Sequence, residues 1–185
     1  MPPKTKITEE MIVDAAFAII REKGYEQLNA RSIAAFLNCS TQPVLYQFRT
    51  VDEIRQAAYR KADAFHSEYI IPKGKDEEAM LTMGLNYVRF AHEEKNLFRF
   101  LFQTDHFDGM NIGTLMKGEE LNDIISVISG GMNCDEDQAR EMFISYFCLV
   151  HGLASLLANN SMEYDEALCR KMLEDHFLLL TGQKG

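Results

Sequence analysis

Apolar residues recur along most of the chain at intervals of three and four, the spacing of helices with one buried face. Alternation with a period of two, which half-buried strands show, is absent from the sequence. A first helix is predicted to begin after Thr8, which can cap it, and to end at Gly24. Its apolar stripe consists of Met11, Ile12, Ala15, Ala16, Ile19 and Ile20. These patterns predict an all-α fold.

Two short helices follow the first one. Asn29 can cap a helix over residues 30–37, and Asn38 tolerates the left-handed conformation that ends a helix. Ser40 can cap the next helix, with Pro43 in a first turn where its missing N–H does no harm. The side chains predicted to point inward from this helix are Val44, Leu45 and Phe48. Two short helices joined by a turn of about three residues form the helix-turn-helix pattern.

The rest of the chain also has helical spacing, and about nine helices are expected in total. The later ones are predicted at residues 50–69, 76–94, 96–104, 114–129, 135–159 and 163–181, with a loop at 105–113. Gly130–Gly131 is predicted to end the helix before it. The last helix is predicted to place on one side Ala167, Leu168, Met172, Leu173 and Leu179. We expect two domains, residues 1–50 and 51–185, with a connector helix over 51–70.

Composition places the chain among globular proteins, and its charge is unevenly distributed along the sequence. The 185 residues are 46% hydrophobic and 25% charged, and the net charge is −9. Residues 1–66 contain nine Lys and Arg and eight Asp and Glu, whereas the remainder contains ten and twenty. If any part of the chain binds nucleic acid, its first third is therefore the expected part.

Several classes of protein are disfavoured by the sequence. Cys39, Cys134, Cys148 and Cys169 are scattered, which is typical of a reducing compartment. The N-terminus lacks an apolar signal segment, and the apolar run 142–158 is shorter than a usual membrane span, so a cytoplasmic protein without a membrane is expected. No standard enzyme or metal-site motif occurs, so we expect no enzyme activity, no cofactor and no metal.

The segment from Thr8 to Ile54 resembles the DNA-binding domain of TetR-family transcriptional regulators. The residues that carry the resemblance are Gly24–Tyr25, Arg31, Ile33–Ala34, Ser40, Gln42–Pro43, Phe48 and Asp52–Glu53. The sequence departs from the family pattern at Asn38, where a glycine is usual. It also has Leu45 in place of a tyrosine that contacts phosphate, and Val51 in place of a lysine.

The resemblance implies that the second short helix reads DNA. A recognition helix exposes polar side chains at its N-terminal end, and Gln pairs with adenine through two hydrogen bonds. Residues that close the helix are expected near backbone phosphates, and Lys4 and Lys6 suit either a DNA-attracted arm or a solvated tail. The candidate DNA-binding residues are Arg31, Ser40, Thr41, Gln42, Pro43, Val44, Tyr46, Gln47 and Arg49.

A weaker resemblance covers residues 146–157, YFCLVHGLASLL, which look like one of the two dimerisation helices of the family. The apolar helix 135–159 also needs burial on nearly every face, which favours an interface. The candidate dimer residues are Cys148, Gly152, Ser155, Leu156, Leu168, Met172 and Phe177. A single-chain core helix is the alternative interpretation.

Soft apolar side chains predict a ligand cavity or a filled core in the second domain. The candidates are Met83, Phe90, Phe98, Phe102, Phe107, Met116, Phe143, Phe147 and His151. We therefore expect a homodimeric regulator, most often a repressor in this family, with a near-palindromic double-stranded DNA operator and a small apolar ligand that releases it. The alternative is a helical dimeric small-molecule or protein-binding module that has lost DNA binding.

Overall fold

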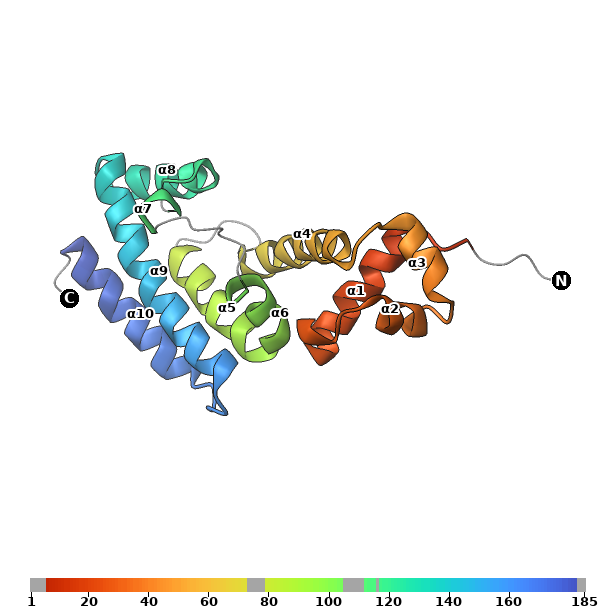
Figure 1. Ribbon diagram of the computed structural model, residues 1–185. Helices are drawn as coiled ribbons and strands as arrows, with labels where there is room; N and C mark the ends of the chain where they lie inside the picture. Colours follow the sequence, from red (N-terminus) through yellow and green to blue (C-terminus); the bar gives the residue numbers. More distant parts are fainter. Residues whose placement is uncertain (1–5, 73–78, 105–111, 116, 183–185) are drawn as a thin grey trace. The chain divides into compact units, whose positions relative to one another are not determined.

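The computed structural model describes residues 6–72, 79–104, 112–115 and 117–182. Within these ranges the chain forms ten α-helices and two short 3-10 helices, with no strand, so the predicted all-α fold is confirmed (Figure 1). The helix beyond the nine expected is the four-residue α7. The elements are α1 Glu9–Lys23, η1 Tyr25–Gln27, α2 Ala30–Phe36, α3 Thr41–Gln47, α4 Val51–Ile70, α5 Ala79–Glu93, α6 Lys95–Phe102, α7 Ile112–Leu115, η2 Glu119–Leu121, α8 Asn122–Met132, α9 Glu136–Asn159 and α10 Glu166–Thr181.

The chain divides into two compact units, each of which draws on two stretches of sequence. The first unit is Met1–Tyr69 with Glu93–Thr104, and the second is Ile70–His92 with Asp105–Gly185. The first unit therefore contains α6 in addition to the helix-turn-helix elements. The second contains α5 and the helices from α7 to α10.

The first unit is built around α1. Thr8 accepts a hydrogen bond from the Met11 N–H, as predicted for its cap, and Gly24 ends the helix at a φ of 90° that favours glycine. α1 packs against α2 and against α6. From α6, the ring of Phe100 stacks on Tyr25 at 6.1 Å and meets Tyr59 of α4 edge-on at 5.9 Å. The buried face of α4 carries Ile54, Ala58, Ala62 and His66, one residue per helical turn.

The second unit is built around the hairpin of α9 and α10, which run antiparallel and pack side by side (Figure 1). Asp135 caps α9 by accepting from the Gln138 N–H, so the predicted start and end of this helix are confirmed. α8 covers the first turns of α9 through a cluster of Ile125, Ile128 and Ala139. The hydroxyl of Tyr146 on α9 donates to the carbonyl of Met80 on α5 at 3.3 Å.

The predicted helix at 114–129 is wrong in both its limits and its continuity. The structure has α7, a 3-10 turn that begins after Gly118, and then α8. Gly130–Gly131 lies inside α8 because the end is formed instead by Asn133, in the left-handed conformation at φ 51°. Most of the predicted loop 105–113 lies outside the described residues.

Two predictions of side-chain direction are also wrong. Leu45 was expected to point inward, but it is 47% exposed on α3. The expected apolar side of the last helix is split between two faces of α10. Leu173 is buried together with Cys169, whereas the exposed face carries Leu168, Met172 and Leu179. Because α10 begins at Glu166, capped by Asp165, it is also three residues shorter than predicted.

Candidate nucleic-acid interface and apolar surfaces

The turn between α2 and α3 is closed by backbone hydrogen bonds. The N–H groups of Asn38 and Cys39 reach back to the carbonyls of Ala35 and Ala34, at 3.2 and 2.9 Å. This pattern requires a left-handed residue, and Asn38 provides it at φ 51°. The asparagine that replaces the family's usual glycine is therefore compatible with the helix-turn-helix, as the sequence indicated.

The start of α2 is closed in a different way. The side chain of Asn29 accepts from the N–H groups of Arg31 and Ser32, and the Ser32 hydroxyl accepts from the Asn29 N–H. This reciprocal capping box fixes the backbone from which Arg31 projects. Arg31 is exposed, so its guanidinium is available to a partner outside the chain.

The N-terminal end of α3 presents polar side chains. Ser40 occupies the N-cap position but makes no capping hydrogen bond within the described chain, so its exposed hydroxyl is not committed to the helix. Gln42 is exposed in the first turn, and Thr41 and Pro43 are half-buried. Pro43 stands where its missing N–H leaves no helical hydrogen bond unmade, as predicted.

Val44 is the one predicted DNA contact that the structure turns inward. Its side chain is fully buried in the core of the first unit, where it holds α3 in place. The expectation that Val44 points inward is thus correct, and its second role as a base contact is not compatible with this position. Leu45, which is exposed, presents the apolar surface that a thymine methyl group requires.

The residues at the C-terminal end of α3 differ in their exposure and in their hydrogen bonds. Tyr46 is 85% exposed, and Arg49 is exposed just beyond the helix. The Arg49 N–H donates to the carboxylate of Glu53, whose own N–H donates to the Thr50 hydroxyl, so Thr50 caps the start of α4 and Glu53 holds the backbone of Arg49. The side-chain amide of Gln47 instead donates to the Ile7 carbonyl. Phe36 is 52% exposed at the end of α2, and the sequence analysis assigned it no role.

In the second unit, three of the predicted ligand residues form a row along one face of α9. The rings of Phe143 and Phe147 stack at 6.0 Å, and Phe147 lies 5.5 Å from the ring of His151. Tyr87 of α5, which sequence analysis did not select, is 6.1 Å from Phe147 and hydrogen-bonds to Nδ1 of His151 at 2.9 Å. Burial lowers the pKa of His151 and so favours its neutral form.

The other predicted ligand residues are distributed between the units. Phe90 is fully buried in α5, where Met83 is half-buried. Phe98 is fully buried and Phe102 half-buried in α6, which belongs to the first unit. Phe107 and Met116 lie outside the described residues.

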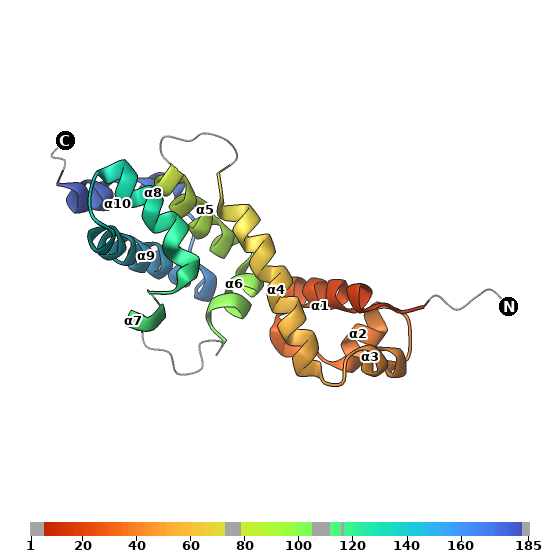
Figure 2. The same cartoon turned by 90° about the horizontal axis from the view of Figure 1, so that it is seen from above.

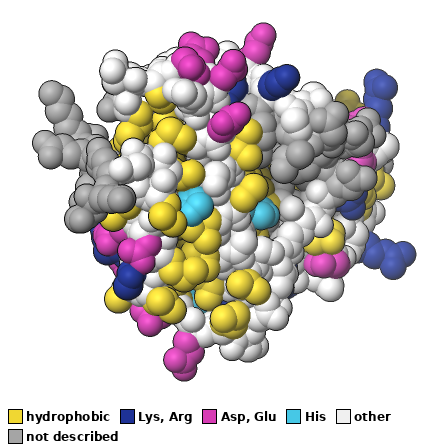
Figure 3. All heavy atoms as spheres, turned by 90° about the vertical axis from the view of Figure 1, so that its left-hand side faces the viewer, with side chains coloured by type: hydrophobic (Ala, Val, Ile, Leu, Met, Phe, Trp, Pro, Cys, Tyr) yellow, Lys and Arg dark blue, Asp and Glu magenta, His cyan; other side chains and the backbone are white. Residues whose placement is uncertain are grey.

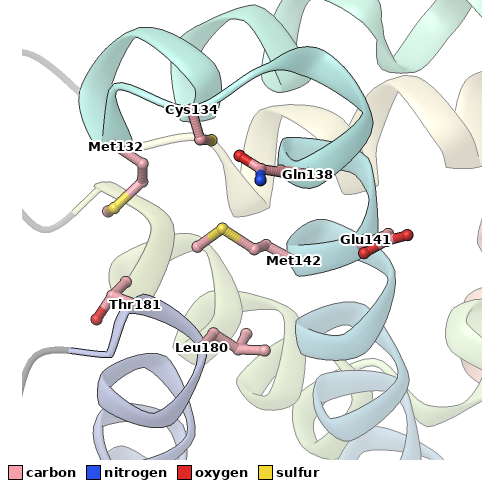
Figure 4. Close-up of a pocket in the computed structure, with 7 residues that line it drawn as sticks. All are labelled: Met132, Cys134, Gln138, Glu141, Met142, Leu180 and Thr181. Carbon is pink, nitrogen blue, oxygen red and sulfur yellow. The ribbon is translucent and has the colours of Figure 1, made fainter.

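A cavity of about 660 Å³ lies where the second unit brings together the end of α8, the start of α9 and the end of α10. It is lined by Met132, Cys134, Gln138, Glu141, Met142, Leu180 and Thr181. Figure 4 shows Met142 in the middle of this set, with Cys134 and Gln138 on one side and Leu180 on the other, while Glu141 points away. None of the lining residues belongs to the row formed by Phe143, Phe147 and His151.

The predicted dimer residues lie on the exposed faces of α9 and α10. Five of them line a groove of about 610 Å³, and these are Cys148, Gly152, Ser155, Leu156 and Met172. Leu168 is 54% exposed, and Phe177 is half-buried. Figure 3 shows hydrophobic side chains gathered on the side of the second unit that carries these helices. An open apolar surface of this kind is typical of a protein–protein interface.

α9 is also unusual in its length and its apolar composition. Within the described ranges it is the one helix long and apolar enough to span a membrane, judged by length and composition. A helix that packs in a bundle meets the same criterion. The buried residues of α9, which include Val150, Ala154 and Leu157, face the unit, and Cys148 and Gly152 lie on the exposed side.

Comparisons with known proteins identify the fold. No protein-family model and no curated protein sequence matches the chain. Among solved structures, it is similar to a TetR-like transcriptional regulator from Rhodococcus sp. RHA1, with 15% sequence identity, a TM-score of 0.67 and 100% of both chains covered. The resemblance seen in residues 8–54 is therefore confirmed as a likeness of fold that extends over the whole chain.

Proposed function

We propose that this chain is a sequence-specific DNA-binding transcriptional regulator of the cytoplasm, with α3 as its recognition helix. The observation that carries the proposal is the exposed polar start of α3, with Ser40 and Gln42 on a turn locked by backbone hydrogen bonds. A rigid helix with short polar side chains at its N-terminal end fits the major groove. The TetR-like fold of the whole chain supports the same function.

The side chains differ in the part of the DNA that each is suited to contact. Gln42 is the residue best suited to read a base, since its amide pairs with the N6 and N7 edge of adenine. Arg31 can donate two hydrogen bonds to guanine or to a phosphate. Tyr46 and Arg49, at the far end of α3, are suited to backbone phosphates, which position the protein without reading sequence.

The first test is selection of genomic DNA fragments by the purified protein, followed by binding to the enriched fragment at two salt concentrations. We expect one near-palindromic sequence and a steep loss of affinity with salt. Arg31→Ala and Gln42→Ala should weaken operator binding while the variants stay folded. Arg60→Ala and Gln56→Ala, which remove the same residue types from exposed positions of α4, serve as controls. Wild-type operator affinity in Gln42→Ala would remove this residue from the readout.

The regulator is proposed to act as a homodimer through the exposed faces of α9 and α10. A two-fold pair places two recognition helices on half-sites about one turn of DNA apart, roughly 34–36 Å, which is why a near-palindromic operator is expected. Two helices from each chain would form a four-helix bundle. The groove lined by Gly152 and Leu156 supports this face as the interface.

Release from the operator by a small apolar ligand, and hence repression, is part of the proposal. A ligand changes DNA affinity only if it binds one conformer better than another. The row of Phe143, Phe147 and His151 supports a site for an aromatic compound. An apolar fluorescent probe, 8-anilinonaphthalene-1-sulfonate, should bind the wild type and bind Phe147→Ala at least tenfold more weakly. Equal binding by both proteins would place the probe elsewhere.

A second candidate function rests on Leu45. This exposed leucine stands where the family carries a tyrosine that contacts phosphate, so α3 has lost one anchor to DNA. A helical dimer that binds small molecules or proteins, and no longer DNA, would have this feature. This function would be favoured if the folded dimer enriched no DNA fragment even at low salt.

A further inference from the structure

The recognition elements of the first unit form an uncharged stretch of the chain. Residues 32–48 contain no Lys, Arg, Asp, Glu or His, although at 25% charged residues about four would be expected. The stretch covers most of α2, the turn and α3, and α2 and α3 pack on each other (Figure 2). Arg31 and Arg49 border it, and both are exposed. Charged contacts with phosphates therefore come from its two ends, and its middle is suited to hydrogen bonds and apolar contacts with bases.

The exposed apolar side chains of the first unit lie in the same stretch. Among the described residues of this unit, the large hydrophobic side chains that are exposed are Phe36, Leu45 and Tyr46. Phe36 ends α2, and the other two lie in the last turn of α3. Tyr46 has a hydroxyl that can bond to phosphate, whereas Leu45 offers apolar surface alone. The core does not require Leu45, because Val44 beside it is the residue of α3 that is fully buried.

Leu45 lies on the same exposed face of α3 as Gln42, three residues further along the helix. A helix rises 1.5 Å per residue, so the two Cα atoms are about 4.5 Å apart along its axis. Neighbouring base pairs of DNA are about 3.4 Å apart. With α3 in the major groove and the Gln42 amide on an adenine, Leu45 therefore faces the next base pair. The apolar group that the major groove offers there is the 5-methyl of thymine.

We propose that Leu45 is a specificity residue that reads the 5-methyl group of a thymine, in the base pair next to the adenine read by Gln42. The inference rests on the proposed DNA-binding function and names a feature that the operator must contain. The family that the chain resembles has a tyrosine at this position, and its contact with phosphate carries no sequence information. Leu45 thus replaces a positioning contact with one that reads a base. Operator affinity then depends on one methyl group in each half-site.

The methyl group is tested with the selected operator, in which each thymine in turn is replaced by uracil, which lacks only the 5-methyl. For the wild-type protein we expect one position per half-site at which affinity falls about fourfold, the typical value of one buried methyl group. Replacement in both half-sites should lower affinity about fifteenfold. Leu45→Ala, whose shorter side chain does not reach the base, should bind the thymine and uracil operators within a factor of about two. Val127→Ala, which shortens a side chain 71% exposed on α8, is the control and should keep the full discrimination.

Cytosine provides a second test of the same contact. A C·G pair at the identified position presents no methyl group, whereas a 5-methylcytosine·G pair presents one at the same place in the major groove. We expect 5-methylcytosine to raise wild-type affinity about fourfold over cytosine and to have little effect on Leu45→Ala. Because an apolar contact releases no counterion, the ratio between the thymine and uracil operators should be equal at two salt concentrations, while both affinities fall.

The outcomes separate this inference from the function on which it rests. If no uracil substitution lowers wild-type affinity while Gln42→Ala loses operator selectivity, the reading role of Leu45 is overturned and the regulator stands. If Leu45→Ala discriminates thymine from uracil as well as the wild type does, another residue contacts the methyl group and the inference is again overturned. If the wild-type protein binds no DNA at low salt, both the inference and the proposed function are overturned.

Discussion

The guanidinium of Arg21, near the end of α1, donates two hydrogen bonds to the carboxylate of Glu94, immediately before α6; the Nε–Oε2 distance is 2.8 Å. The same guanidinium lies 5.1 Å from the ring centroid of Phe65 on α4. The Asn96 side chain also donates to the Arg21 carbonyl at 3.0 Å. One side chain thus connects three helices of the first unit, and it explains why α6 folds with the helix-turn-helix elements.

Replacement of Arg21 by lysine should weaken this connection while keeping the charge. A lysine ammonium cannot present the planar pair of donors that Glu94 receives, and it would lose the stacking on Phe65. The Arg21 side chain is 45% exposed, so we expect a decrease in the free energy of unfolding of only about 1 kcal/mol. Urea unfolding measures it, and Lys23→Ala, an exposed change at the same helix end, is the control. An unchanged midpoint would show that the pair contributes nothing measurable.

His66 should make the first unit sensitive to acid. It is buried on α4 with its ring 5.1 Å from that of Phe102, and burial lowers its pKa from 6.5 to about 4. Above pH 6.5 the histidine is neutral in both the folded and the unfolded chain, so it carries no penalty. Between pH 6.5 and 4 the unfolded chain takes up a proton that the folded chain excludes, and about 3 kcal/mol of stability is lost.

The measurement is the free energy of unfolding from pH 7.5 to pH 4 for the wild type and for His66→Gln. The variant cannot titrate, so this part of the pH dependence should disappear while other groups still contribute. Equal pH dependence in the two proteins would mean that His66 is protonated in the folded state. His151→Gln, in the second unit, is a useful comparison because burial lowers the pKa of His151 as well.

Gly84 marks a close approach of helices in the second unit. A Cβ at this position would lie 2.6 Å from the Tyr146 hydroxyl and 3.2 Å from a methyl group of Leu173. We expect Gly84→Ala to reduce the free energy of unfolding by about 1–3 kcal/mol through overpacking. Gly130→Ala is the matched control, because a Cβ there meets no described atom within 4 Å and alanine favours a helix. Equal melting temperatures for the two variants would contradict the packing of α5 on α9.

Much of the first unit could be predicted from sequence because its signals are local. Caps at Thr8 and Asn29, the glycine stop at Gly24 and the left-handed Asn38 each depend on a few neighbouring residues. The end of α8 was misplaced, since Gly130–Gly131 is a strong local stop signal but lies inside the helix, which Asn133 ends instead. The membership of α6 in the first unit depends on Arg21 and Glu94, 73 residues apart, and no local pattern reveals such a pair.

The candidate sites were predictable to different degrees. Spacing on α3 selected the exposed Ser40 and Gln42 and correctly predicted that Val44 points inward, but it also placed the exposed Leu45 inward. The bond from Gln47 to Ile7 joins distant residues and leaves no sequence signal. Tyr87 was missed for the same reason, since its link to His151 becomes visible only when α5 and α9 are packed together.

Gly152 provides the sharpest test of the proposed dimer. Apart from the adjoining backbone of α9 itself, no atom of the described residues lies within 4 Å of a Cβ built on Gly152, so a larger side chain should not disturb the single chain. In a four-helix bundle the same position would meet the partner's helix, and overpacking at two symmetric sites should raise the dimer Kd by at least thirtyfold, since each site costs about 1–3 kcal/mol. Gly152→Leu should therefore be a folded monomer with weakened operator binding, whereas Gly130→Leu, on the equally open α8, should stay dimeric. Sedimentation equilibrium measures the Kd, and a wild-type value for Gly152→Leu would place the interface on another face of the second unit.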